Sequence, residues 1–206
     1  MSTIAPSMPV VASPPVVRTP FTPRPFRWTV TEFHHVGETG VFDNRRPVLI
    51  RGILLEQGMM NPPHAVAVNL TMVAVGQAFG AGYCVRVQLP LVLGLDTDPM
   101  PDIVVAEGDP RTYVTNHPTA ATLVIEVSDT TLALDLTEKA ELYATAGVPD
   151  YWILDLAGRR LLVLRDPAPV TAGGSAYRSQ LTLSPTESIN PLGAPNATIK
   201  VADLLP

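Results

Sequence analysis

Short apolar runs recur through the second half of the chain, and each has the length of a β-strand. The clearest are DIVVAE (102–107), ATLVIEVS (121–128), DYWILDL (150–156) and RLLVLRD (160–166). Apolar runs of roughly four to eight residues, bounded by turn residues, favour buried strands over helices. Because a sheet of such strands needs cover on its faces, we expect helices elsewhere in the chain to pack against it.

Three other segments have helix signals. Thr29 and Glu32 stand at the spacing of a capping box and predict a short helix that runs to about Glu38. A long helix is predicted from Pro62 to about Phe79, since proline is favoured in the first turn. A third helix is predicted over 135–146, with Asp135 as its N-cap and a glycine directly after its end. Together with the apolar runs, these segments predict an α/β fold with a mixed β-sheet flanked by helices.

Prolines gather at the start of the chain. The sequence has 22 prolines in 206 residues, and seven of them lie between Pro6 and Pro25. Such a stretch favours extended, polyproline-like backbone over packed structure. We therefore expect a flexible proline-rich arm over residues 1–26 and a single domain over residues 27–206.

Charge and cysteine content exclude several classes of protein. The formal net charge of −5 excludes a globally basic nucleic-acid binder, although an enzyme that holds a metal ion between carboxylates is still allowed. The single cysteine, Cys84, excludes an intramolecular disulfide and a zinc site built from several cysteines, and it favours a cytoplasmic location. No apolar run approaches ~18 residues, so no membrane span is expected.

Two acidic residues interrupt the apolar strand runs. Asp102 follows a proline at the start of DIVVAE, and Glu126 lies in the middle of LVIEVS. A charge inside a buried strand is costly unless it is paired or bound to a metal ion. Taken singly, Glu126 is also compatible with a salt-bridged strand residue, and Asp102 with a turn residue. Lys139 stands four residues after Asp135, which alone is typical of a solvated ion pair on a surface helix.

Together, two carboxylates and a lysine are what metal-assisted cleavage of a phosphodiester requires. Carboxylate oxygens are ligands for Mg²⁺, which polarises the phosphate and lowers the pKa of a bound water molecule. A lysine stabilises the negative charge that develops during the attack. This combination makes Asp102, Glu126 and Lys139 the candidate catalytic residues, with Mg²⁺ or Mn²⁺ as the ion.

A set of motifs resembles the Uma-two family of the PD-(D/E)XK nuclease superfamily. The motifs are PDIVV, LVIEVSD, a D-x-x-x-K-x-x-x-Y pattern and AGVPDYWILDL, and the resemblance extends over roughly 27–167. It implies a restriction-endonuclease-like fold and a metal-dependent endonuclease that hydrolyses DNA. By the same resemblance, Asp102 and Glu126 would be the metal ligands, and Lys139 would replace the usual strand lysine, where this chain has Ser128. Gln88 would be an accessory polar group.

One position departs from the family pattern. Relatives have a glutamate before a Leu-Ile-Asp-Gly turn, whereas this chain has Val48 there and Arg51 in place of the aspartate. Glu56, across a hairpin predicted over 48–57, is a weak substitute. The alternative function is therefore a catalytically degenerate module that binds nucleic acid or protein, and hydrolysis of another phosphodiester or a nucleotide is a third option.

For partners, we expect DNA, no membrane, and a homodimer. Phosphate contacts are expected from five arginines: Arg45, Arg46, Arg51, Arg86 and Arg111.

Overall fold

The computed structural model describes residues 22–171 and 173–206. Most of the proline-rich arm predicted over 1–26 lies outside these residues. A six-stranded mixed sheet forms the centre of the fold, in the order β3-β4-β5-β6-β7-β8. Its strands are β3 (Tyr83–Val87), β4 (Ile103–Glu107), β5 (Leu123–Ser128), β6 (Asp150–Asp155), β7 (Arg160–Pro169) and β8 (Ser175–Leu183). Only β5 and β6 run parallel; every other neighbouring pair is antiparallel. The predicted α/β fold with a mixed sheet and flanking helices is confirmed.

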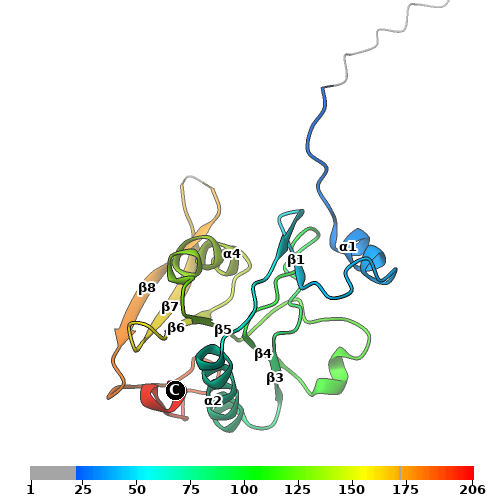
Figure 1. Cartoon of the computed structure of the whole chain (residues 1–206). Helices are drawn as coiled ribbons and strands as arrows, with labels where there is room; N and C mark the ends of the chain where they lie inside the picture. The colour runs from blue at the N-terminus through cyan, green and yellow to red at the C-terminus, as the bar shows by residue number, and fades with distance from the viewer. Residues whose placement is uncertain (1–21, 172) are drawn as a thin grey trace, which may run out of the picture.

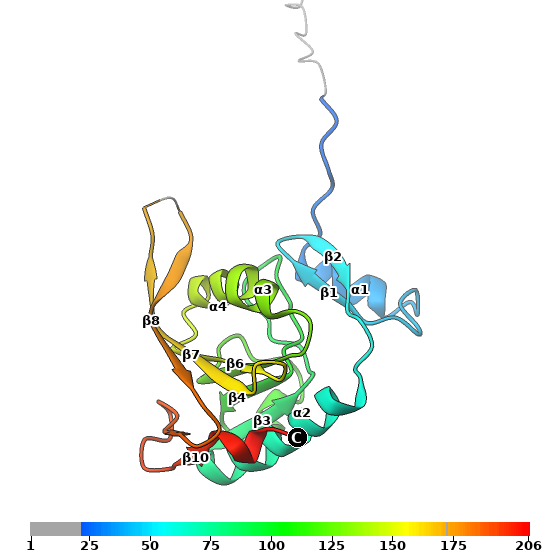
Figure 2. The same ribbon diagram turned by 60° about the vertical axis from the view of Figure 1, so that its left-hand side comes forward.

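Helices cover both faces of this sheet (Figures 1 and 2). One face packs against α2 (Pro62–Phe79) and the short 3₁₀ helix η3 (Val201–Leu204). The other face lies under a continuous helical segment made of α3 (Leu132–Leu134), the π-helical turn η2 (Asp135–Lys139) and α4 (Ala140–Thr145). Each face has its own apolar core, because successive side chains along a strand point to opposite sides.

The N-terminal part of the described chain forms a separate subassembly at the end of the sheet. It contains α1 (Val30–Gly37) and a hairpin of β1 (Pro47–Ile50) and β2 (Ile53–Glu56). The predicted capping box is confirmed, since the Thr29 hydroxyl accepts from the Glu32 amide and the Glu32 carboxylate accepts from the Thr29 amide. Gly52 turns the hairpin at φ 75°, where a Cβ would meet Arg27 at 2.9 Å.

The remaining short elements join or close the main ones. The 3₁₀ helix η1 (Pro110–Tyr113) follows β4, and β9 (Ser188–Ile189) pairs with β10 (Ile199–Lys200) near the C-terminus. None of the helices in the described part of the chain is both long and apolar enough to cross a membrane.

The third predicted helix differs from expectation at its start. The helical segment begins at Leu132, and Asp135 lies inside it with helical dihedral angles, so its assignment as the N-cap is wrong. The Asp135 carboxylate is fully buried; it accepts from the Thr131 hydroxyl at 2.7 Å and lies 2.8 Å from the Lys139 ammonium. It therefore binds side chains and leaves the amides of the helix terminus uncapped. The prediction that Asp135 and Lys139 form a solvated surface pair is also wrong, because the Asp135 carboxylate is fully buried.

Candidate active site

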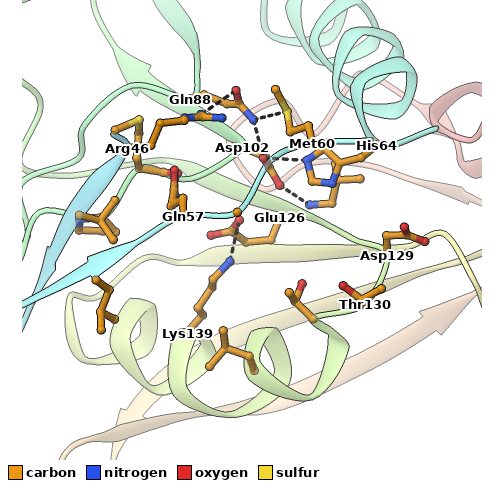
Figure 3. A pocket seen from close by; sticks show the side chains of 18 of the residues that line it. Arg46, Gln57, Met60, His64, Gln88, Asp102, Glu126, Asp129, Thr130 and Lys139 are labelled. Atoms are coloured by element: carbon orange, nitrogen blue, oxygen red, sulfur yellow. Dashed lines mark hydrogen bonds and ion pairs between the residues drawn. The ribbon is translucent and has the colours of Figure 1, made fainter. Parts of the chain in front are cut away.

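The two strand acids lie side by side at one end of the sheet. The last residue pair between β4 and β5 is Ile103 with Ile125, so Asp102 and Glu126 stand at the next position of the same ladder. Cross-strand neighbours on one face have Cβ atoms about 4.5–5.5 Å apart. Beyond this pair, the Asp102 side chain rather than its backbone bonds to β5, since its Oδ2 accepts from the Val127 amide at 2.9 Å. Both carboxylates point into the same cavity (Figure 3).

Besides the Val127 amide, four side chains contact these carboxylates. Lys139 lies with its Nζ 3.1 Å from Glu126 Oε2 and 2.8 Å from Asp135 Oδ1. The Tyr143 hydroxyl donates to Glu126 Oε1 at 2.6 Å. Asp102 Oδ1 accepts from Gln88 Nε2 at 3.0 Å and lies 3.1 Å from His64 Nε2. Thus the structure brings together Asp102, Glu126 and Lys139, which the sequence singled out, and the expected accessory group Gln88. It adds His64, Asp135 and Tyr143 to them.

Burial and neighbouring charges shift the pKa values of these groups in different directions. Burial raises the pKa of Glu126 to about 7, although the Lys139 ammonium opposes the shift. Burial also acts to raise the pKa of Asp102, but hydrogen bonds from His64, Gln88 and the Val127 amide outweigh it and lower the pKa. The pKa of Lys139 is raised, because Glu126 and Asp135 outweigh the effect of its burial. At neutral pH, Asp102 is therefore ionised, Glu126 is close to its pKa, and Lys139 is charged.

The cavity above these groups has a volume of about 440 Å³. The β1–β2 hairpin and the loop after it, residues 57–61, form one wall, and the helical segment from α3 to α4 forms the other. Its floor is polar, and its walls combine apolar side chains with polar ones such as Glu56, Gln57 and Glu138. Val48 and Glu56 both line it, so the position that is a glutamate in the resembling family does face the site.

The donor set suits a hard divalent cation. Among the residues that the structure describes, no three His, Cys, Asp or Glu side chains are grouped as ligands for one metal ion. Mg²⁺ does not need such a cage, since proteins bind it through one or two carboxylates together with water and substrate phosphate oxygens. Asp102 and Glu126 are of the right chemistry and in the right number. To hold an ion, Glu126 would exchange its contact with Lys139, and Asp102 its contact with His64 or Gln88.

From the sequence alone, His64 could either approach the site or face solvent. A histidine at the start of a helix is more often structural or solvent-facing, but the His64 side chain is only 16% exposed and reaches Asp102. Hydrogen bonding to Asp102 raises its pKa. The sequence feature that could have indicated this position is Asn61, the N-cap of α2. Its side chain accepts from the His64 amide at 3.0 Å and so fixes the first turn of the helix, which contains His64.

The five arginines expected to contact phosphate are dispersed. Arg46 lines the cavity and donates to Gln88 at 3.1 Å. Arg51 pairs with Glu141 at 2.6 Å, and the buried Arg86 lies over the Tyr113 ring. Arg45 and Arg111 do not line the cavity.

Comparison with known proteins agrees with this architecture. The family model described as "Uma2: Putative restriction endonuclease" matches residues 31–202. The structure is similar to a nuclease of the DUF820 group from Anabaena variabilis, itself described as putative, with a TM-score of 0.63 and 16% sequence identity. That likeness covers 86% of this chain and 97% of the other. A search of the curated proteins finds no match. Because the family model spans most of the folded chain, the protein belongs to the Uma2 family.

Proposed function

We propose that the protein is a metal-dependent endonuclease that hydrolyses DNA phosphodiester bonds. The observation that supports this most strongly is the meeting of Asp102, Glu126 and Lys139 at the floor of one cavity, with Lys139 Nζ 3.1 Å from Glu126. These groups come from two neighbouring strands and a helix, and each alone has an ordinary structural explanation. A nuclease site requires all three in one place.

Each group has a distinct role in this proposal. Asp102 and Glu126 would hold Mg²⁺ or Mn²⁺, which supplies Lewis-acid polarisation of the phosphate and a more acidic water molecule. Lys139 would stabilise the negative charge that develops on the phosphate oxygens. Asp135 keeps the ammonium charged and close to the floor, and Tyr143 holds Glu126 in position. His64 and Gln88 fix the orientation of the Asp102 carboxylate.

The test is metal-dependent cutting of supercoiled plasmid by the wild-type chain, Asp102→Asn and Glu126→Gln, purified in parallel. We expect both variants to lose about a hundredfold or more in rate, since even the outer partners of a metal ligand are worth ~10–100-fold. EDTA should abolish the wild-type reaction. Cutting at the same rate by all three proteins would contradict the proposal.

Val48 favours a second candidate, a degenerate member of the family that binds nucleic acid or protein without cutting it. An apolar side chain lies in the cavity wall at the position of the family glutamate. Calorimetric titration with Mn²⁺ separates the two candidates. Binding that disappears in Asp102→Asn supports the endonuclease, whereas no binding to the wild type, with or without DNA, supports the degenerate module.

A further inference from the structure

Exposed apolar side chains gather around the mouth of the cavity. They are Leu55, Met59, Met60 and Leu134, with exposed fractions of 49%, 100%, 42% and 41%. Isolated exposed apolar residues are normal on a protein surface. Four of them around one cavity, above a polar floor, are typical of a site that binds a partly apolar ligand. We call these four residues the apolar rim.

The rim is directly connected to the proposed catalytic floor. Gln88 Nε2 donates to Asp102 Oδ1 at 3.0 Å and lies 2.8 Å from the Met60 sulfur (Figure 3). One amide thus holds the Met60 thioether beside the Asp102 carboxylate. A ligand that touches Met60 therefore has its neighbouring groups within reach of Asp102 and Glu126.

The charges of the cavity do not suit the backbone of a DNA duplex. The lining has five acidic residues, namely Glu56, Asp102, Glu126, Asp129 and Glu138, against Arg46 and Lys139. Lys139 is already engaged by two carboxylates. Proteins that hold duplex DNA neutralise several phosphates with lysine and arginine over ~1,000 Å² or more. The lining of this cavity offers a single arginine for that purpose.

The size and the apolar rim suit one unpaired nucleotide. A cavity of about 440 Å³ lies within the range of sites for small ligands. In a duplex the faces of the bases are stacked on one another, whereas a single strand exposes them to apolar side chains. Enzymes that take a base into a pocket act on single strands or on nucleotides extruded from the stack.

We propose that the substrate is single-stranded DNA, with an unpaired base against Met60 and Leu134 and its adjoining phosphodiester over Asp102 and Glu126. This inference rests on the proposed endonuclease function. In the reaction, a water oxygen forms a bond to phosphorus as the bond from phosphorus to one sugar oxygen breaks. The water supplies the proton of the released hydroxyl, so the products are a phosphate monoester and an alcohol.

The experiment compares a labelled single strand, its blunt duplex and a duplex with a single-stranded tail, all in Mn²⁺. We expect the single strand to be cut at least ~10-fold faster than the blunt duplex, because a paired base must first be unstacked. Cuts in the tailed duplex should fall in the tail. Met60→Ala and Leu134→Ala should each raise the KM for the single strand about tenfold with little change in kcat.

Val73→Ala is the matched control, since Val73 is 52% exposed on α2 and does not line the cavity. It should leave all three rates unchanged. If Asp102→Asn abolishes cutting but the duplex is cut as fast as the single strand, this inference fails and the endonuclease function stands. If no cutting depends on Asp102, the function itself fails. A wild-type dimer that the rim variants dissociate, with unchanged KM, would make the rim a protein interface and overturn the inference.

Discussion

At the scale of single residues, the site depends on how neighbouring side chains stabilise the buried carboxylate of Glu126. Glu126 is 3% exposed in the middle of an otherwise apolar strand, and a lone charge there would be prohibitively costly. Lys139 and Tyr143 satisfy one oxygen each. The compensation is incomplete, because burial still raises the pKa of Glu126 to about 7. A carboxylate that is only partly stabilised by its protein neighbours is well suited to accept a cation.

This imbalance predicts the pH dependence of stability in metal-free protein. The pKa of Glu126 rises from 4.5 to about 7 on folding. The stability that its protonation gives the folded state is therefore fully present below pH 4.5 and is lost as the pH rises through 7. Glu126→Gln cannot titrate. We therefore expect the melting temperature of this variant, relative to wild type, to increase between pH 4.5 and 8 in EDTA.

Glu32→Gln provides the control with the opposite sign. Hydrogen bonds from Thr29 lower the pKa of the exposed Glu32 carboxylate, so its contribution is present at neutral pH and lost as the pH falls. The relative melting temperature of Glu32→Gln should decrease as the pH rises through the acidic range. The same pH trend in both variants would contradict our account of Glu126.

At the scale of elements, one helix start and one π-helical turn position the groups around the floor. The N-terminus of α2 holds His64 against Asp102, and Asn61 fixes this turn by capping the helix and donating to Asp129. On the opposite wall, the π-helical turn from Asp135 to Lys139 holds the lysine over Glu126. Such π turns in α-helices are frequent at functional sites. His64 and Lys139 are therefore positioned by a capped helix start and by a π-helical turn within a helix.

Removing the two helix caps should separate stability from function. Asn61→Ala and Thr29→Ala each delete the side chain that caps a helix, at a cost of about 1 kcal/mol. We expect similar losses in the free energy of unfolding by urea. Only Asn61→Ala should also weaken Mn²⁺ binding, because it loosens His64 beside Asp102. Equal effects of the two variants on Mn²⁺ affinity would show that α2 does not position the site.

At the scale of the whole molecule, the sheet is held between two cores of different origin. The buried residues of the core under α4 lie between Leu91 and Leu164, whereas the core under α2 also includes buried residues from Ile189 to Leu205. Val201, Leu204 and Leu205 are buried there against a helix more than a hundred residues earlier in the chain. Closure of the fold therefore depends on its last residues.

Deletion of residues 201–206 should destabilise the protein severely. Three buried apolar side chains are lost, each worth about 1.5–3 kcal/mol. We expect the melting temperature to fall by about 10 °C or more. As a control, deletion of residues 1–21, in the predicted proline-rich arm, should change it by less than about 2 °C. Comparable shifts for the two deletions would contradict this view of the fold.

Much of the architecture is determined by local sequence. Apolar runs of strand length set β4 to β7, Asn61 with Pro62 and Pro63 starts α2, and the Arg51-Gly52 turn joins β1 to β2. These features act over a few residues, through alternation, capping and backbone conformation, and so they are visible in the sequence. The alternation of side chains along β5, which places Glu126 on one face of the strand, is equally local.

Only the tertiary structure decided which polar groups meet. Spacing along the chain favoured a solvated surface pair for Asp135 and Lys139, yet Asp135 is fully buried and Lys139 lines the cavity. His64, at the start of a helix, lines the cavity as well. These contacts are determined by the register of β4 against β5 and by the packing of α4 and α2 against the sheet. His64 and Asp102, for example, are 38 positions apart and meet only where α2 lies against the sheet. Local sequence specifies each element, but electrostatic compensation between elements exists only after they are assembled, and it is this compensation that makes the site.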